Sequence, residues 1–193
     1  RAGQLTRFLD LIPIEYRDGT EDGRVTIPFE LQEAVAFHDG IEQAFADLQS
    51  ELAEIDPAAV AAVERDLDKL GGYIDDAHER VAVVPEEDVE ALHDRISDRL
   101  DGLFPDAWKD GGSEVDYDLV EISIDQLIAA ANAGEWDQAE QARLSAYAFF
   151  EFGPEPELRA FDPGLVVDVE GLFWYGARDH EGLAALISSR APT

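Results

Sequence analysis

Apolar residues recur at intervals of three and four along most of the chain, and this spacing limits the folds that the chain can adopt. Such intervals place apolar side chains on one face of an α-helix, whereas a half-buried strand needs strict alternation, and no stretch alternates in that way. We therefore predict an all-α fold, a helical bundle of about seven or eight helices. The clearest apolar series are Leu5, Phe8, Leu9 and Ile12 in 4–16, and Val89, Leu92, Ile96 and Leu100 in 84–104.

Residues that start and stop helices place most of the boundaries. The Asp-Pro pairs at 56–57 and 162–163 predict two helix starts, because Asp caps a helix N-terminus and Pro suits its first turn. We expect the helix after the first pair to stop at the glycine pair 71–72, and Pro13 to blunt the end of the first helix. Connectors are expected at 16–28, 105–118 and 132–137, and further helices at 28–52, 122–132, 136–151 and 181–189.

The length of 193 residues is enough for one domain with a substantial core. Apolar residues make up 46% of the chain, so it can bury a core despite its charge. We predict a single all-helical domain over 1–193. The alternative is two halves, 1–104 and 118–193, joined by the loop 105–117.

The chain carries a formal net charge of −30, from 44 acidic against 14 basic residues, and its only lysines are Lys69 and Lys109. A surface this acidic repels itself at low salt, so we predict a halophilic protein rather than an ordinary acidic domain. The charge excludes nucleic acid as a partner and disfavours anionic membrane surfaces, while it permits cations, basic partners and small molecules. Cysteine is absent, which excludes thiolate metal sites and cysteine nucleophiles.

No apolar run approaches about 20 residues, so we predict no transmembrane helix and no direct membrane insertion by this chain. The sequence begins at Arg1 and contains no methionine. We therefore expect a domain fragment of a longer polypeptide, with an upstream segment that has room for a signal peptide or membrane anchor.

Motifs for covalent or nucleotide chemistry do not occur: the sequence has no G-x-S-x-G, no G-x-G-x-x-G and no P-loop. Glu90-x-x-His93 and a weaker Asp75-x-x-His78 resemble parts of a ferritin-like di-metal site. In so acidic a chain roughly one such match is expected by chance. An enzyme with a di-metal centre, which needs His78 and His93 to converge, is therefore the least favoured hypothesis, and we predict that the chain is not an enzyme.

Glu30 and Glu33 form the first group of candidate cation ligands. They lie three residues apart in the first turn of a predicted helix, where acids also favour the helix dipole. Two carboxylates on one helix face can instead hold a hard cation. The spacing alone leaves both interpretations open.

A second group surrounds a Gly-Pro break at 153–154. Glu151 and Glu155 flank the break, and Tyr147 shares a helix face with Glu151. The break predicts the end of one helix and the start of the next, with an acid at the new N-terminus. Alternatively the carboxylates converge on a cation, since aromatic surroundings raise the cost of leaving them without a partner. The arginines that a purely structural role would use are Arg7, Arg143 and Arg159.

Two stretches resemble one known family. The segment 5–37 is similar to the start of the extracytoplasmic domain of bacterial high-affinity iron permeases, in which a Leu-rich helix precedes a Gly-x-Val turn and a Glu-Tyr-x-Glu helix. Glu15 stands where the family has Asp, and Leu31 replaces the aromatic residue of the second helix. The matching residues are Tyr16, Gly23, Val25, Glu30 and Glu33.

The segment 130–174 resembles the end of the same domain, which carries Ala-Tyr-x-x-x-Phe-Glu, a Pro/Glu step and a helix with a central Glu. The Pro/Glu step is one residue longer here. The matching residues are Gly134, Ala139, Ala146, Tyr147, Glu151, Glu155, Leu158 and Glu170.

The resemblance implies an all-helical extracytoplasmic domain of the cell surface, tethered through flanking segments, that captures or hands over a cation during iron uptake. The implied cofactor is iron, without an organic cofactor. The permease's intramembrane Arg-Glu-x-x-Glu motif does not occur, so the implied partner is a membrane permease or a fused surface domain, such as a blue-copper domain. The alternative is a structural or partner-binding surface module without metal. The implied metal ligands are Glu30, Glu33, Tyr147, Glu151 and Glu155.

Overall fold

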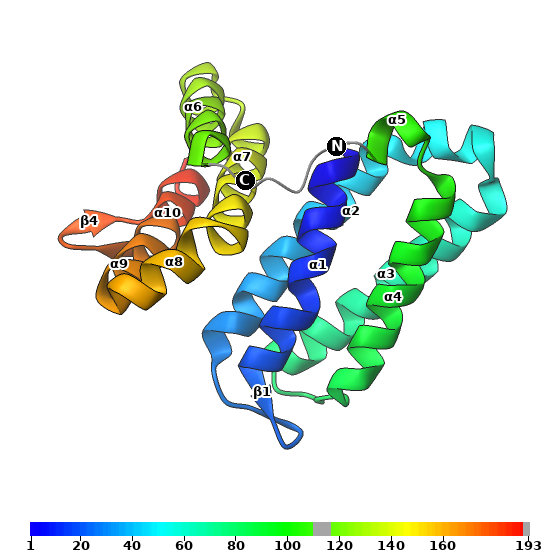
Figure 1. Cartoon of the computed structure of the whole chain (residues 1–193), viewed down its shortest axis with the longest axis horizontal. Helices are drawn as coiled ribbons and strands as arrows, with labels where there is room; N and C mark the ends of the chain where they lie inside the picture. The colour runs from blue at the N-terminus through cyan, green and yellow to red at the C-terminus, as the bar shows by residue number, and fades with distance from the viewer. Residues whose placement is uncertain (110–116, 191–193) are drawn as a thin grey trace. The chain divides into compact units, whose positions relative to one another are not determined.

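Helices make up most of the described structure, and the strands are two short hairpins, which confirms the prediction of an all-α fold (Figure 1). This computed structural model describes residues 1–109 and 117–190. It divides into two units, Arg1–Gly112 and Ser113–Thr193. Half of the predicted connector 105–118 lies outside the described residues, but its described ends are helical, as the short α5 (Asp106–Lys109) and the start of the next helix.

The first unit is a four-helix bundle (Figure 1). α1 contacts α2 and α4, and α3 contacts the same two helices, so each bundle helix has two neighbours. Short connections join consecutive helices, as in an up-and-down bundle. The bundle helices are α1 (Ala2–Gly19), α2 (Pro28–Ile55), α3 (Pro57–His78) and α4 (Glu86–Leu103).

The apolar residues that the spacing predicts to face inward in the first and last bundle helices are all buried. Tyr16 is fully buried as well, and it ties distant parts of the unit together. Its hydroxyl donates a hydrogen bond to the carbonyl of Val84 at 3.2 Å and accepts one from the Val84 N–H at 3.0 Å. The end of α1 is thereby fixed to the connection between α3 and α4.

Two bundle helices run further than the local signals predict. α1 continues past Pro13, whose fixed φ is compatible with a helix, because apolar residues on both sides of it are buried. α3 does not stop at the glycine pair 71–72 but continues to His78. A helical glycine costs about 1 kcal/mol, and the burial of Leu70 and Ile74 around the pair outweighs that cost.

The predicted connector 16–28 contains a small antiparallel hairpin, β1 (Thr20–Glu21) and β2 (Arg24–Val25), with Thr20 opposite Val25. Its turn residues, Asp22 and Gly23, both have positive φ, at 50° and 70°. A two-residue turn of this kind matches the twist of paired strands. The hairpin reverses the chain between α1 and α2.

The second unit starts with two neighbouring helices, α6 and α7, which turn at Gly134 with a φ of 78°. The Gly-Pro break at 153–154 separates α7 from α8, as predicted. α8 contacts α7 and α9, and α10 contacts the same two helices. The elements are α6 (Tyr117–Ala133), α7 (Trp136–Phe152), α8 (Pro154–Phe161), α9 (Pro163–Phe173), β3 (Gly176–Ala177), β4 (His180–Glu181) and α10 (Leu183–Ser188).

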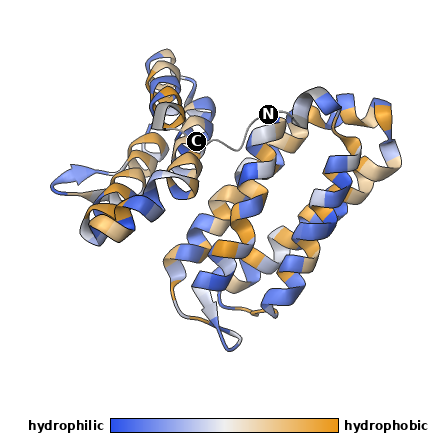
Figure 2. Ribbon diagram, in the orientation of Figure 1, coloured by the Kyte–Doolittle hydropathy of each residue, from blue (hydrophilic) through white to orange (hydrophobic). Residues whose placement is uncertain are grey.

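Hydrophilic and apolar residues are mixed along the helices of both units (Figure 2). The longer helices bury one face and expose another, as amphipathic helices do. Within residues 1–109 and 117–190, no helix is both long enough and apolar enough to cross a membrane.

Candidate metal site

Three carboxylates meet where α1 ends and α2 begins. Glu15, Glu30 and Glu33 each place one carboxylate oxygen within 4.8 Å of the others. Glu15 and Glu33 are 3% and 1% exposed, and Glu30 is half-buried. Two of the residues predicted as ligands, Glu30 and Glu33, therefore lie together with a third carboxylate from a different helix. We call these three residues the carboxylate cluster.

The close approach of α1 to α2 sets the geometry of the carboxylate cluster. The carbonyl of Gly19 accepts hydrogen bonds from the N–H groups of Thr26 and Ile27, at 2.9 and 3.2 Å, which brings the chain back after the hairpin. A Cβ atom on Gly19 would lie 3.0 Å from Cγ of Leu31 and 3.2 Å from Cβ of Glu30. Because Gly19 has no Cβ atom, the end of α1 can lie against the start of α2.

Ionised carboxylates at this separation repel one another. Two unit charges 4.8 Å apart interact by on the order of 3 kcal/mol at the effective dielectric constant of a protein surface. A proton or a cation between the oxygens relieves that repulsion. Oxygen ligands from two packed helices suit a hard cation, so the carboxylate cluster is a candidate site for such an ion.

The second predicted group lies around the break between α7 and α8. Tyr147 is 1% exposed, and the centre of its ring lies 5.2 Å from that of Phe173 and 5.5 Å from that of Trp174. One carboxylate oxygen of Glu151 and one of Glu155 are buried. The aromatic surroundings expected from the sequence are therefore present around these acids.

Glu155 has a cationic partner on its own helix. Arg159, one turn further along α8, forms an ion pair with Glu155 and lies 3.5 Å from a carboxylate oxygen of Glu170. Arg143 is fully buried and forms an ion pair with Glu140 at 2.6 Å. The pairing of Glu155 with Arg159 is the contact that a structural role predicts for this acid.

The two predicted sets of ligands belong to different units. Glu30 and Glu33 lie in the first unit, whereas Tyr147, Glu151 and Glu155 lie in the second. A single site that combines both sets therefore stays a prediction.

The di-metal hypothesis gains no support from the histidines. Nε2 of His93 lies 3.1 Å from Oδ1 of Asp10, and Nδ1 lies 3.0 Å from Oδ1 of Asp94. The hydrogen bond with Asp10, above all, raises the pKa of His93, although burial opposes it. Among the described residues, the clusters that are able to hold a metal ion include neither His78 nor His93.

The sequence pattern does not single out Glu15 as a ligand, although it marks this residue as the counterpart of a family Asp. It also misses His38, Asp39 and Glu42, which form a second cluster of possible ligands on α2. In the sequence, the spacing of His38 and Glu42, four residues apart on one helix face, is the signal that points to this cluster.

The first unit is also the part of the chain that matches a known family. A family model, the iron permease-associated 4-helix bundle domain, matches residues 1–107. That match covers more than half of the chain, and the chain belongs to this family. No curated protein and no solved structure matches it. The segment 5–37 lies inside the matched region, and the resemblance of 130–174, which lies outside it, stays a prediction.

Proposed function

We propose that this chain is a non-enzymatic, extracytoplasmic domain that captures an iron cation and hands it to a membrane permease. Membership of the iron permease-associated family supports the link to iron uptake. The observation that carries capture is the carboxylate cluster, in which Glu15, Glu30 and Glu33 point oxygens at one another across two helices. The cation is cargo here, so binding must be reversible.

The exposure of the three acids gives the cation a direction of entry. Glu30 is half-buried, while Glu15 and Glu33 are almost fully buried. A cation therefore meets Glu30 first and leaves past it. The net charge of −30 raises the local concentration of cations around the whole surface and favours capture.

The surroundings of the protein follow from the same proposal. A domain that serves a permease from outside the cytoplasm is tethered to the cell surface through segments that flank this chain. A strongly acidic surface suits high salt, because mobile cations screen its self-repulsion.

A second candidate function is a structural or partner-binding surface module without metal, attached to a permease or to a blue-copper-type domain. The ion pair between Glu155 and Arg159 favours it, because an acid held by an arginine stabilises the unit without a metal. On this alternative, Tyr147 and Glu151 serve only the packing of the second unit.

Calorimetric titration of Fe³⁺, kept soluble as a weak citrate chelate, into the protein in molar KCl tests the proposal. Three double variants separate the alternatives. E30Q/E33Q removes two charges from the carboxylate cluster, and E151Q/E155Q removes the second predicted group. E51Q/E54Q is the matched control, with the same charge change and spacing on exposed positions of the same helix.

We expect stoichiometric binding by the wild type and by E51Q/E54Q, and a loss of about a hundredfold or more in affinity for E30Q/E33Q. If E151Q/E155Q loses as much affinity as E30Q/E33Q, both groups supply ligands, which would support the single shared site. An absence of iron binding in the wild type would overturn metal capture and leave the structural module.

A further inference from the structure

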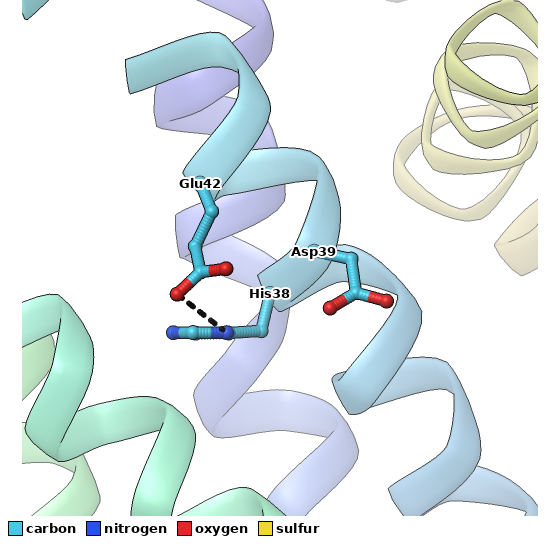
Figure 3. A group of neighbouring side chains, drawn as sticks. All are labelled: His38, Asp39 and Glu42. Carbon is cyan, nitrogen blue, oxygen red and sulfur yellow. Dashed lines mark ion pairs between the residues drawn. The ribbon is translucent and has the colours of Figure 1, made fainter. Parts of the chain in front are cut away.

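A second group of metal-ligand atoms lies on α2, one turn or more beyond the carboxylate cluster. His38, Asp39 and Glu42 each offer an atom within 4.8 Å of the others. Figure 3 shows the carboxylate of Glu42 over the imidazole of His38, with Asp39 beside them on the same helix. The group differs from the carboxylate cluster because it contains a nitrogen ligand.

The imidazole of His38 is held in one orientation. The side chain belongs to a residue only 7% exposed, and its Nε2 lies 3.0 Å from the carbonyl oxygen of Leu67 on α3. A carbonyl only accepts hydrogen bonds, so Nε2 carries the hydrogen. In the neutral ring Nδ1 then keeps a lone pair, and a backbone carbonyl behind the opposite nitrogen is the usual support of a metal-binding histidine.

Nδ1 of His38 faces a second acceptor. It lies 4.0 Å from Oε1 of Glu42, which is too long for a hydrogen bond. A metal ion that binds at about 2.1 Å from each atom fits between two atoms up to about 4.2 Å apart. Since Glu42 is exposed, its side chain can also move closer to reach tetrahedral geometry.

Gly71 on α3 fixes the ring from the other side. A Cβ atom at this position would lie 2.5 Å from Cε1 of His38 and 2.9 Å from its Nε2. The imidazole therefore lies directly on the backbone of α3, and this contact adds to the hydrogen bond with Leu67 in holding its orientation. This close approach explains why glycine occupies the middle of a long helix.

The ligand atoms border a pocket of about 190 Å³ between α2 and α3. Asp68 and Asp75 of α3 also line it, so four carboxylates face the same space as His38. A water molecule takes about 30 Å³ in the liquid, so the pocket has room for a cation with some of its hydration shell.

We propose that Nδ1 of His38, together with carboxylate oxygens of Glu42 and Asp39, binds a borderline divalent cation of the Zn²⁺ class. Mixed imidazole and carboxylate ligation is typical of such ions, whereas the all-oxygen carboxylate cluster suits a harder one. This second site does not depend on the proposed iron capture, because the two share no ligand.

Titration with Zn²⁺ tests the site. Calorimetry measures the affinity, and the ¹⁵N NMR signals of the histidine rings report which nitrogen binds the metal. H38Q removes the nitrogen ligand, and H180Q is the matched control on an exposed histidine. E42Q and D39N keep His38 and its packing on Gly71, so they decide the question even if H38Q does not fold. E30Q/E33Q tests whether zinc binds the carboxylate cluster instead.

We expect Zn²⁺ to shift the Nδ1 signal of His38, with affinity lost in H38Q, lowered about tenfold or more in E42Q, and unchanged in H180Q and E30Q/E33Q. Zinc binding that disappears in E30Q/E33Q but survives in E42Q would overturn the site. So would a protonated Nδ1 that excess Zn²⁺ leaves unchanged at pH 8, since His38 would then be a simple ion-pair partner of Glu42.

Discussion

The buried carboxylates of the two units have different neighbours. In the first unit, Glu15, Glu30 and Glu33 come from two helices and converge on one another. In the second unit, Glu155 faces Arg159 one turn along its own helix. In the first arrangement carboxylates lie next to one another, and in the second a carboxylate lies next to an arginine. In a protein this acidic, the groups around a carboxylate therefore separate a candidate cation site from a structural ion pair better than the carboxylate alone does.

The largest effect is expected for Gly182→Ala, which tests whether the two units unfold independently. In Gly182→Ala, the new Cβ would lie 2.1 Å from the carbonyl oxygen of Trp174 and 2.6 Å from the nitrogen of Tyr175. Main-chain atoms have little freedom to move, so we expect the second unit to lose about 3 kcal/mol of stability. Urea unfolding, followed by tryptophan fluorescence and by circular dichroism, measures this loss.

Gly72→Ala is the control for that experiment, because no other atom lies within 4 Å of the new Cβ. The first unit should be unaffected, or more stable by about 0.5–1 kcal/mol, since alanine is the better helix former. If Gly182→Ala shifts a single transition of the whole chain, the two units unfold together and the comparison between them fails.

The next test uses one substitution in each unit, with opposite expected signs in metal-free protein. Glu30→Gln removes repulsion on the order of 3 kcal/mol and loses a helix-dipole contribution of about 0.3–1 kcal/mol, so we expect about 2 kcal/mol of added stability. Glu155→Gln removes the partner of Arg159 and should cost about 1 kcal/mol. Urea unfolding in the presence of a chelator measures both. Equal signs would show that the two acids play the same structural part.

The fold was predictable wherever local spacing determines it. The periodic apolar residues of 4–16 and 84–104 are the buried ones, and the break at 153–154 separates two helices. The end of α3 was not predictable, because the glycine pair 71–72 reads as a helix stop. Only the contact of Gly71 with His38, on another helix, shows why glycine lies inside α3.

The candidate sites were predictable in part for the same reason. Glu30 and Glu33 stand close in sequence, and the family pattern marks them. Glu15 joins them only through the packing of α1 on α2, and Nδ1 of His38 is directed by the Leu67 carbonyl of α3. Contacts between helices leave no periodic signal, so sequence spacing alone misses such ligands.

Tyr16→Phe removes the buried hydroxyl that joins the end of α1 to the connection between α3 and α4 in the first unit. The variant leaves the carbonyl and the N–H of Val84 without their hydrogen bonds to the ring oxygen. We expect the first unit to lose about 1–2 kcal/mol, and the second unit to be unchanged. Thermal unfolding followed by circular dichroism measures the loss. A change below a few tenths of a kcal/mol would mean that water replaces both bonds.

The smallest effect is a pH dependence carried by the first unit. Hydrogen bonding to Asp10 across α1 and α4 raises the pKa of His93 above its ordinary value of about 6.5, although burial opposes this. The folded state therefore binds the proton more tightly than the unfolded state. The resulting stabilisation is complete below about pH 6.5 and is lost as the pH rises through the raised pKa.

We expect a contribution of less than about 1 kcal/mol, as for most exposed ion pairs. His93→Gln should flatten this part of the pH profile of unfolding, and His180→Gln, on an exposed strand of the second unit, should leave it in place. Molar KCl should weaken the effect, because Asp10 is itself partly exposed and salt screens the pair. If His93→Gln leaves the pH profile unchanged, the pKa of His93 is the same in the folded and the unfolded protein, and the hydrogen bond with Asp10 adds no pH-dependent stability.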